Sequence, residues 1–472
     1  MTFSQRLLWQ LCSLVLLLLS LDSRVSGFAQ AQEQAVLEPG LDVTLSHIQY
    51  VPKTEPNSPR HDVEKKRLLE TLKRPDGDEL PKDHPRYRLL QAMHGYFRHE
   101  ERYIDQLTKW EQSYTDLPEA QKKVIEASTN YKDVFEHATK GWEVNGKLSE
   151  EIVIAGLAYY GVTDEELNEF IIKQEEDKEW DNQAAITDAI NHYVRDWSDD
   201  GLHERGPTFD PILETIKQHF PDRATRKEGP VKVMIPGQGM GRLPHDVASL
   251  GNMEVTSNEY SYYMNLAYRF LETLSIPKSV RFHPYQDWWS YQPNPAERIA
   301  EVTIPDVPVN ASNVLMCEGD FMHIFDHETG HYDVVITLFF IDTAKNSLDY
   351  IDNINRLLKP GGLWINLGPL LYGTNPTMQL SLEEMVQVSE TMGFKFLDTD
   401  EKWGTISLPG KTVRGKEINY LVNPRSLRRN VYITQFWVAE KVHRDYDAFP
   451  KGTEKSSTPE HTFNSGERAR KR

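Results

Sequence analysis

The chain has 472 residues, enough for two or three domains, and 39% of them are hydrophobic, so long polar segments are expected. Its formal net charge of −18 argues against a nucleic-acid-binding protein, because such proteins present a basic surface. Two cysteines, Cys12 and Cys317, are too few for a disulfide scaffold or a cysteine-based zinc site, and the sixteen histidines form no H-E-x-x-H pattern, so no metal is expected.

The first 31 residues have the features of a targeting segment. An apolar run at 7–21 follows a positive charge at Arg6, and Ala29-Gln30-Ala31 is a cleavage pattern. Because the run is short for a membrane span of about 20 residues, we expect a signal peptide, with an uncleaved signal-anchor as the alternative. Either would send the protein into the secretory pathway, and only the anchor would hold it on a membrane. The protein would be cytosolic if the segment is not used.

The next part of the chain is polar and then helical. Residues 32–85 are charged and rich in proline, which predicts a flexible leader with one short helix near 62–73. Apolar residues then recur at helical spacing, so we expect an all-helical region over 86–182. Its predicted helices begin at Tyr87 and end before Leu117-Pro118, and then cover 119–138, 149–160 and 164–178.

The second half begins with two helices and a glycine-rich turn. Helices are predicted over 184–196 and 211–220, with a polar loop at 199–207 between them. An apolar run, 231–235, then leads into Gly237-Gln238-Gly239-Met240-Gly241, a helix, a short strand and the acidic Glu259. This order opens a doubly wound nucleotide site, in which bare glycines let a ligand lie against the backbone and a carboxylate binds ribose hydroxyls. A purely structural glycine turn is the alternative.

Further strands alternate with helices, which predicts an α/β fold with a mostly parallel, Rossmann-like sheet. The predicted strands are 314–321, 332–340, 363–367, 394–396 and 431–441, the last of them an antiparallel edge. A long aromatic and proline-rich segment, 276–308, is expected to pack on the core or cap the site, and the tail 444–472 to be disordered.

Two acidic residues follow predicted strands. Asp320-Phe321 combines a carboxylate with an aromatic ring, as an adenine site requires, although a capping role is the alternative for Asp320. Asp342 follows the most apolar strand, at the edge where open α/β sheets hold their ligands. It could equally be the N-cap of the next helix, and both roles can hold at once.

Together these features resemble the class I S-adenosylmethionine-dependent methyltransferases, and more closely the carnosine N-methyltransferase family. The resemblance covers about 86–441, with 276–308 and 398–430 diverged. The matching stretches are VRDWS (194–198), IPGQGMGRL (235–243), SNE (257–259), GDF (319–321), FFIDTAKN (339–346), LDYID (348–352) and LLKPGGLWINLGPLLY (357–372).

The resemblance implies a cofactor, S-adenosyl-L-methionine, and a set of residues that bind it. The implied cofactor set is His192 (a glutamine in the family), Arg195, Gly237, Gly239, Glu259, Asp320, Phe321 and Leu338. From the bare sequence, Arg195 could equally be a surface residue paired with an aspartate.

The substrate residues implied by the family are Asp342 and Tyr432, and Asp342 is expected to be catalytic by holding the second imidazole N–H during methyl transfer. A family histidine that contacts the imidazole corresponds to Gly373 here, which puts the usual substrate in doubt.

The expected activity is methylation of an imidazole nitrogen of carnosine, giving anserine, or of a related histidyl dipeptide. A methyltransferase of the same fold that acts on a protein or peptide histidine, or on another small amine, is one alternative, and a non-catalytic binding protein is another. The sequence is compatible with a homodimer but does not fix the oligomeric state.

Overall fold

The computed structural model describes residues 58–443 except 76–79, 178, 180–181 and 374. All of these residues belong to one compact unit, Ser46–Arg472. The predicted targeting segment, 1–31, and the predicted tail, 444–472, lie outside the described residues. Within the described part of the chain, no helix combines the length and the apolar character needed to cross a bilayer.

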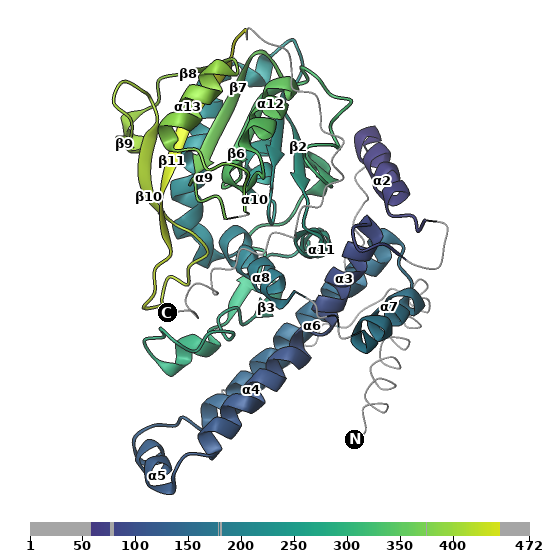
Figure 1. Cartoon of the computed structure of the whole chain (residues 1–472), viewed down its shortest axis with the longest axis vertical. Coiled ribbons are helices and arrows are strands. Elements are labelled where there is room, and N and C mark those ends of the chain that lie inside the picture. Colours follow the sequence, from purple (N-terminus) through teal and green to yellow (C-terminus); the bar gives the residue numbers. More distant parts are fainter. Residues whose placement is uncertain (1–57, 76–79, 178, 180–181, 374, 444–472) are drawn as a thin grey trace, which may run out of the picture. The chain divides into compact units, whose positions relative to one another are not determined.

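A nine-stranded sheet forms the centre of the second half of the chain (Figure 1). Strands β5, β2, β1, β6 and β7 lie side by side in that order and all run parallel. Their bounds are β1 Val231–Pro236, β2 Met253–Glu259, β5 Val314–Glu318, β6 Tyr332–Leu338 and β7 Leu358–Gly368. The chain order reverses between β1 and β6, which makes their carboxyl ends the switch point where doubly wound sheets bind ligands.

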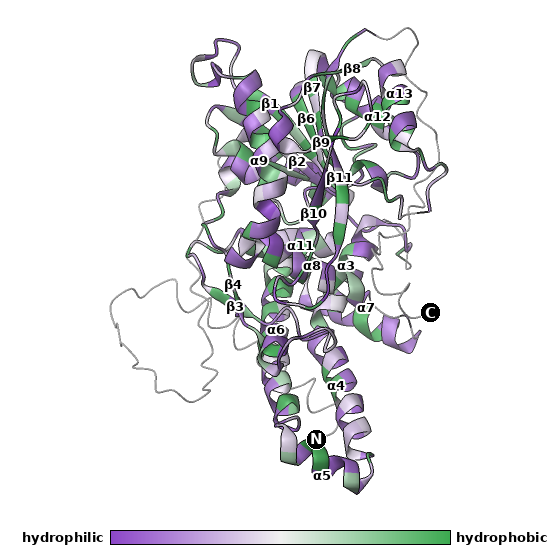
Figure 2. Cartoon of the chain, turned by 90° about the vertical axis from the view of Figure 1, so that its left-hand side faces the viewer, coloured by the Kyte–Doolittle hydropathy of each residue, from purple (hydrophilic) through white to green (hydrophobic). Residues whose placement is uncertain are grey.

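Helices cover both faces of this sheet, which Figure 2 shows nearly edge-on. On one face, α9 (Leu202–His219) and α10 (Arg242–Ala248) bury residues such as Ile212 and Val247 against the strands. On the other face, α12 (Ser347–Leu357) and α13 (Leu382–Thr391) bury Ile354 and Met385. The predicted doubly wound α/β class is therefore confirmed.

The last strand, β11 (Val431–Lys441), is antiparallel as predicted but is not an edge. It pairs with β7 on one side, and on the other with β8 (Phe394–Phe396) and β10 (Arg414–Asn419), beyond which lies β9 (Thr405–Ile406). The sequence did not predict β9, which has only two residues, or β10, which is mostly polar, and most side chains of both remain at least partly exposed.

The helical region has different boundaries from those predicted. Its helices are α3 Pro85–Phe97, α4 His99–Thr115, α5 Glu119–Ser128, α6 Asp133–Tyr160 and α7 Asp164–Glu176. The single helix predicted from Tyr87 divides at Arg98, whose guanidinium binds Glu101 and Glu175. The helix predicted at 119–138 is interrupted after α5, and its end joins the helix predicted at 149–160 in one long helix, α6. It runs beside α4, with α5 at their far end (Figure 1).

The short helix predicted near 62–73 is confirmed as α2 (Pro59–Thr71), which is packed rather than loose. Leu68 and the following Leu72 are buried, and the Arg67 guanidinium donates to the Glu318 carbonyl at 2.7 Å. Two leucines at helical spacing are enough to fix this segment against β5.

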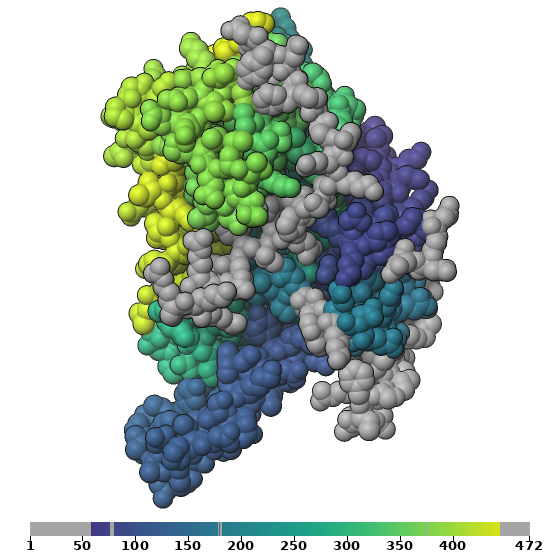
Figure 3. Space-filling view, in the orientation of Figure 1, coloured from purple at the N-terminus to yellow at the C-terminus, as the bar shows by residue number. Residues whose placement is uncertain are grey.

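One of two connecting segments differs from prediction, whereas the other, 276–308, packs on the core as predicted, with Phe282 and Ile304 fully buried. The polar loop predicted at 199–207 is a short 3-10 turn and the first turns of α9, which remain helical although polar because Glu204 and Arg205 are buried and hydrogen-bonded. The segment 276–308 contains a small hairpin, β3 (Val280–Phe282) with β4 (Val302–Ile304). This segment, teal in Figure 3, lies beside the end of the β10–β11 connection, where the Leu427 amide donates to the Tyr291 carbonyl.

Candidate active site

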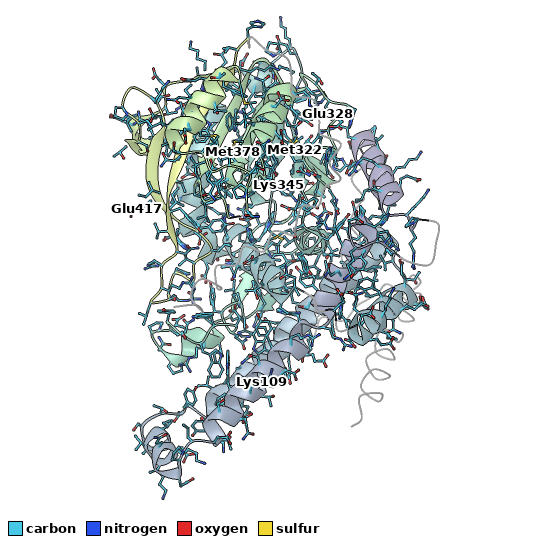
Figure 4. The ribbon with its side chains drawn as sticks, in the orientation of Figure 1. Lys109, Met322, Glu328, Lys345, Met378 and Glu417 are labelled. Carbon is cyan, nitrogen blue, oxygen red and sulfur yellow. The ribbon has the colours of Figure 1, made fainter. Side chains whose placement is uncertain are left out.

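A cavity of about 260 Å³ opens at the carboxyl ends of β1, β2 and β6. Residues of two helices, α8 (Gln183–Trp197) and α11 (Tyr262–Leu271), also line this cavity. Lys345 and Met322, which Figure 4 labels close to the strands, are in its wall. Six residues that the resemblance assigns to the cofactor line this cavity, namely His192, Gly237, Gly239, Glu259, Asp320 and Phe321.

The glycine turn after β1 provides a bare strip of backbone. Gly237 and Gly239 have φ angles of 62° and 57°, in the left-handed region that favours glycine. A Cβ at Gly237 would lie 2.4 Å from the Phe340 ring, and one at Gly239 would lie 3.1 Å from the His192 ring. No larger residue fits without moving an aromatic wall, so the two positions keep the cavity open.

The Glu259 carboxylate lies at the end of β2 and faces the glycine turn. One oxygen, Oε2, accepts from the Gly239 amide at 2.9 Å, and the other, Oε1, accepts from the Tyr260 and Ser261 amides at 2.8 and 2.9 Å. Burial raises its pKa, whereas these three amides act in the opposite direction. A carboxylate has about four acceptor positions, and the three amides occupy three of them. Roughly one position therefore remains for a ligand hydroxyl, where binding of two ribose hydroxyls would need two.

A cluster of aromatic side chains forms another part of the wall. Phe340 and Tyr350 stack at 4.8 Å, and the edge of Phe321 meets Phe340 at 5.5 Å. Beside them, Asp320 Oδ1 accepts from the Met322 amide at 2.9 Å, and Oδ2 lies 3.9 Å from His323 Nε2. Aromatic side chains next to a carboxylate acceptor suit a flat ring that carries an amine, such as an adenine.

His192 approaches the glycine turn from α8. Its Nδ1 donates to the Asp188 carbonyl at 2.7 Å, so the neutral ring carries its acceptor lone pair on Nε2. Burial and the nearby Arg195 guanidinium lower its pKa, which favours this neutral form. His192 can therefore accept a hydrogen bond from a ligand ammonium, and the residues around the cavity together fit S-adenosylmethionine.

The other two predicted cofactor residues, Arg195 and Leu338, do not line this cavity. Arg195 lies instead on a larger cavity of about 780 Å³, together with Tyr432. Tyr420 and Leu421 line both cavities and so lie in the partition between them. The Arg195 guanidinium lies 5.4 Å from the Tyr420 ring centre and 5.6 Å from that of Phe339, close enough for cation–π attraction.

Asp342 lies in a short turn after β6, is only 3% exposed and lines neither cavity. Its Oδ2 accepts from the Leu371 amide at 2.8 Å, so the carboxylate holds the loop that follows β7. Burial raises its pKa to about 6. Asn346, not Asp342, caps α12, so the N-cap alternative is wrong. Gly373 is exposed on the same loop, and a Cβ there would meet only the Leu371 side chain, at 4.0 Å.

Sequence reasoning missed several residues that form these walls. Tyr420 comes from the diverged segment 398–430, which carried no recognisable pattern. Asp188, on α8, lines both cavities, and burial together with Asp287 raises its pKa to about 7. The signal for Asp188 was present, because it lies one helical turn before His192 and thus on the same face.

Known proteins resemble more than half of this chain. A family model described as carnosine N-methyltransferase matches residues 172–443. The carnosine N-methyltransferase of Schizosaccharomyces pombe is 32% identical over 280 residues, which cover 55% of this chain and 71% of the relative. The carnosine N-methyltransferase of Mus musculus is 34% identical over 266 residues, which cover 54% of this chain and 62% of the relative. The chain thus spans less than two thirds of the mouse relative.

Among solved structures, a Haemonchus contortus phosphoethanolamine N-methyltransferase 2 in complex with S-adenosyl-L-methionine aligns with a TM-score of 0.30 and 13% identity, covering 49% of this chain and 46% of that one. This likeness is too weak to add to the assignment, which rests on the family model and the sequence relatives. The chain belongs to the carnosine N-methyltransferase family.

Proposed function

We propose that the protein is an S-adenosylmethionine-dependent N-methyltransferase that methylates an imidazole nitrogen of carnosine, giving anserine, or of a related histidyl dipeptide. The observation that carries the proposal is the pair of adjoining cavities. One has the bare glycine turn and carboxylates suited to the methyl donor, and the other borders Tyr432 and has room for an acceptor. When bound, the donor supplies a methyl group on a sulfonium.

The protein's own contribution is to hold and align the two partners. Glu259 and Asp320 hold the ribose and adenine ends of the donor, and His192 accepts from its ammonium. Tyr420 and Leu421 border both cavities, so their position would set how closely the two partners approach. Alignment alone can lower a barrier by several kcal/mol, and the neutral leaving group needs no proton.

Asp342 orients the acceptor in this proposal. Free imidazole has a pKa of about 6.5, so it is largely neutral at pH 7 and has one nitrogen free to attack. As that nitrogen takes the methyl group, positive charge spreads to the ring's other N–H. The Asp342 carboxylate, already fixed through the Leu371 amide, accepts from that N–H and stabilises the charge. Its pKa of about 6 leaves it mainly ionised at pH 7.

A histidine within a peptide is the second candidate acceptor. The larger cavity, about 780 Å³ against about 260 Å³, offers more room than a dipeptide needs, because a histidyl dipeptide is a smaller molecule than the donor. The absence of a histidine at Gly373 also favours this alternative.

A panel of acceptors separates the candidates. The purified protein is incubated with methyl-labelled S-adenosylmethionine and with carnosine, other histidyl dipeptides, histidyl peptides or simple amines. We expect label on an imidazole nitrogen of carnosine or a related dipeptide. Label on longer peptides alone favours the second candidate, and the absence of both transfer and calorimetric donor binding would refute a methyltransferase.

We also propose that the protein enters the secretory pathway through its first 31 residues. The support is the apolar run at 7–21 and the cleavage pattern Ala29-Gln30-Ala31. Translation in the presence of microsomes should give a protease-protected product, and removal of 1–31 should abolish the protection. A full-length product that remains protease-accessible would contradict this proposal.

A further inference from the structure

The turn after β10, Tyr420-Leu421-Val422, forms part of the partition between the two cavities. Tyr420 and Leu421 line both. The Tyr420 ring lies 4.5 Å from Phe339, at an angle of 31°, and 6.1 Å from Tyr432. The position of this turn therefore sets how closely a ligand in one cavity can approach a ligand in the other.

The turn has a conformation that its sequence does not favour. Leu421 has a φ angle of 48°, in the left-handed region, where the Cβ of a leucine is crowded. On one side, the turn is fixed by paired bonds between Tyr420 and Asn430, each of which contributes a donor to the other's carbonyl. Leu421 and Val422 need another partner, because their amides point away from the strands.

Glu204, on the first turn of α9, is that partner. Its carboxylate is 2% exposed, and its two oxygens accept one amide each: Oε2 from Leu421 at 2.9 Å and Oε1 from Val422 at 2.8 Å. A carboxylate that takes two neighbouring amides in this way makes charge-assisted bonds and fixes the direction of the chain.

The same helix start also fixes Arg195. A Cβ at Gly201 would lie 2.0 Å from the Arg195 carbonyl, and the Arg205 guanidinium donates to that carbonyl at 2.7 Å. Glu204 thus lies between two groups that meet at the partition, the Tyr420 turn and the end of α8. The contacts are short, buried and polar, so a change of one atom in the carboxylate alters them.

We propose that Glu204 is a positioning residue for methyl transfer, which holds the Tyr420–Val422 turn in its left-handed form and so keeps the partition between donor and acceptor in place. The role rests on the proposed function, since it concerns the approach of the two ligands. Glu204 also lines the larger cavity, and its Oε1 lies 3.5 Å from His203 Nε2, but the role proposed for it acts through the two amides of the turn.

The first test compares Glu204→Gln with Glu214→Gln, a control on the same helix whose carboxylate is exposed and binds Lys402. Losing one charge-assisted bond from a buried pair should lower kcat/KM for the acceptor by about tenfold or more, whereas the control should stay within about twofold of wild type. Glu204→Gln activity within about twofold of wild type would overturn the proposal.

The second test asks whether Glu204 acts through the turn. Glycine adopts a left-handed φ without steric cost, so Leu421→Gly should reduce the need for the carboxylate. We expect Glu204→Gln to cost about threefold or less when it is made in the Leu421→Gly background, relative to Leu421→Gly alone. An equal cost in both backgrounds would show that Glu204 does not act by holding the turn and would overturn the proposal.

The last measurement does not depend on activity. Hydrogen exchange of the segment that contains Leu421 and Val422 should be about tenfold faster or more in Glu204→Gln than in wild type, and unchanged in Glu214→Gln. If the wild type transfers no methyl group yet this exchange difference is found, the proposed function fails, while the inference that Glu204 holds the turn stands. If exchange is unchanged in Glu204→Gln, that inference is overturned. If Glu204→Gln does not fold, Glu204→Asp, which keeps the charge on a shorter side chain, replaces it in all three measurements.

Discussion

Replacing Asp342 by asparagine tests the role of its charge while retaining its shape. Asparagine keeps an oxygen that can accept from the Leu371 amide, so the loop after β7 should stay in place. What is lost is the negative charge opposite the ring N–H of the acceptor. The site is 3% exposed, so solvent screens little of that loss.

The magnitude follows from the change in hydrogen-bond type. A bond to a charged group contributes about 1.5–3 kcal/mol and a neutral one about 0.5–1.5 kcal/mol, so the variant should lose about 1–2 kcal/mol of transition-state stabilisation. That corresponds to a decrease of about 5- to 30-fold in kcat/KM. Donor affinity should not change, because Asp342 does not line the smaller cavity.

The pH profile adds a second, independent signature. Two groups must lose a proton for activity, the acceptor imidazole, with a pKa of about 6.5, and Asp342, with a pKa of about 6. As pH falls below about 6, wild-type log kcat/KM should therefore approach a slope of two, and the Asp342→Asn profile a slope of one.

The assay is methyl transfer to carnosine from labelled S-adenosylmethionine across this pH range, with donor affinity measured by calorimetry. Asp400→Asn, at an exposed position, is the control. A variant that keeps wild-type kcat/KM and a slope of two, with donor binding intact, would refute the role of Asp342.

Three further predictions concern His192, Gly237 and Gly373. Lowering the pH should weaken binding of the donor to the wild type, because protonation removes the acceptor lone pair of His192 Nε2. His192→Gln should bind the donor with little pH dependence. Calorimetry that finds the same pH dependence in both proteins would contradict this. Gly237→Ala should weaken donor binding by about tenfold or more, because its Cβ meets Phe340, while Gly251→Ala, left-handed but with open space around it, should lower only the melting temperature. Gly373→His should raise kcat/KM for carnosine about threefold or more if the absent family histidine limits it, and steady-state kinetics with an unchanged value would exclude that cause.

Six of the eight residues that the resemblance assigned to the cofactor line one cavity, and the sequence signals for them are local. The glycine turn and Glu259 follow from the spacing of strand, turn, helix and strand. Asp320 and Phe321 follow from their place at the end of a strand. Each lies within a few residues of an element whose type the pattern made clear, so the fold leaves them little freedom.

The acceptor side could not be predicted in the same way. Tyr420 reaches the partition through a left-handed turn that Glu204 holds from more than two hundred residues away, a contact that no local pattern reveals. Arg195 was predicted to reach the donor, but it lies on the other side of Tyr420. Asp342 was assigned from its position after a strand, whereas its link to the Leu371 amide depends on how the loop after β7 folds back.

The most direct test of the proposed methyl transfer is to identify the methylated atom. The purified protein is incubated with S-adenosylmethionine and carnosine, and the product is analysed by mass spectrometry and NMR. We expect one added methyl group on an imidazole nitrogen and an equal amount of demethylated donor. A protein that binds the donor but leaves the imidazole of every histidyl acceptor unmodified would contradict it.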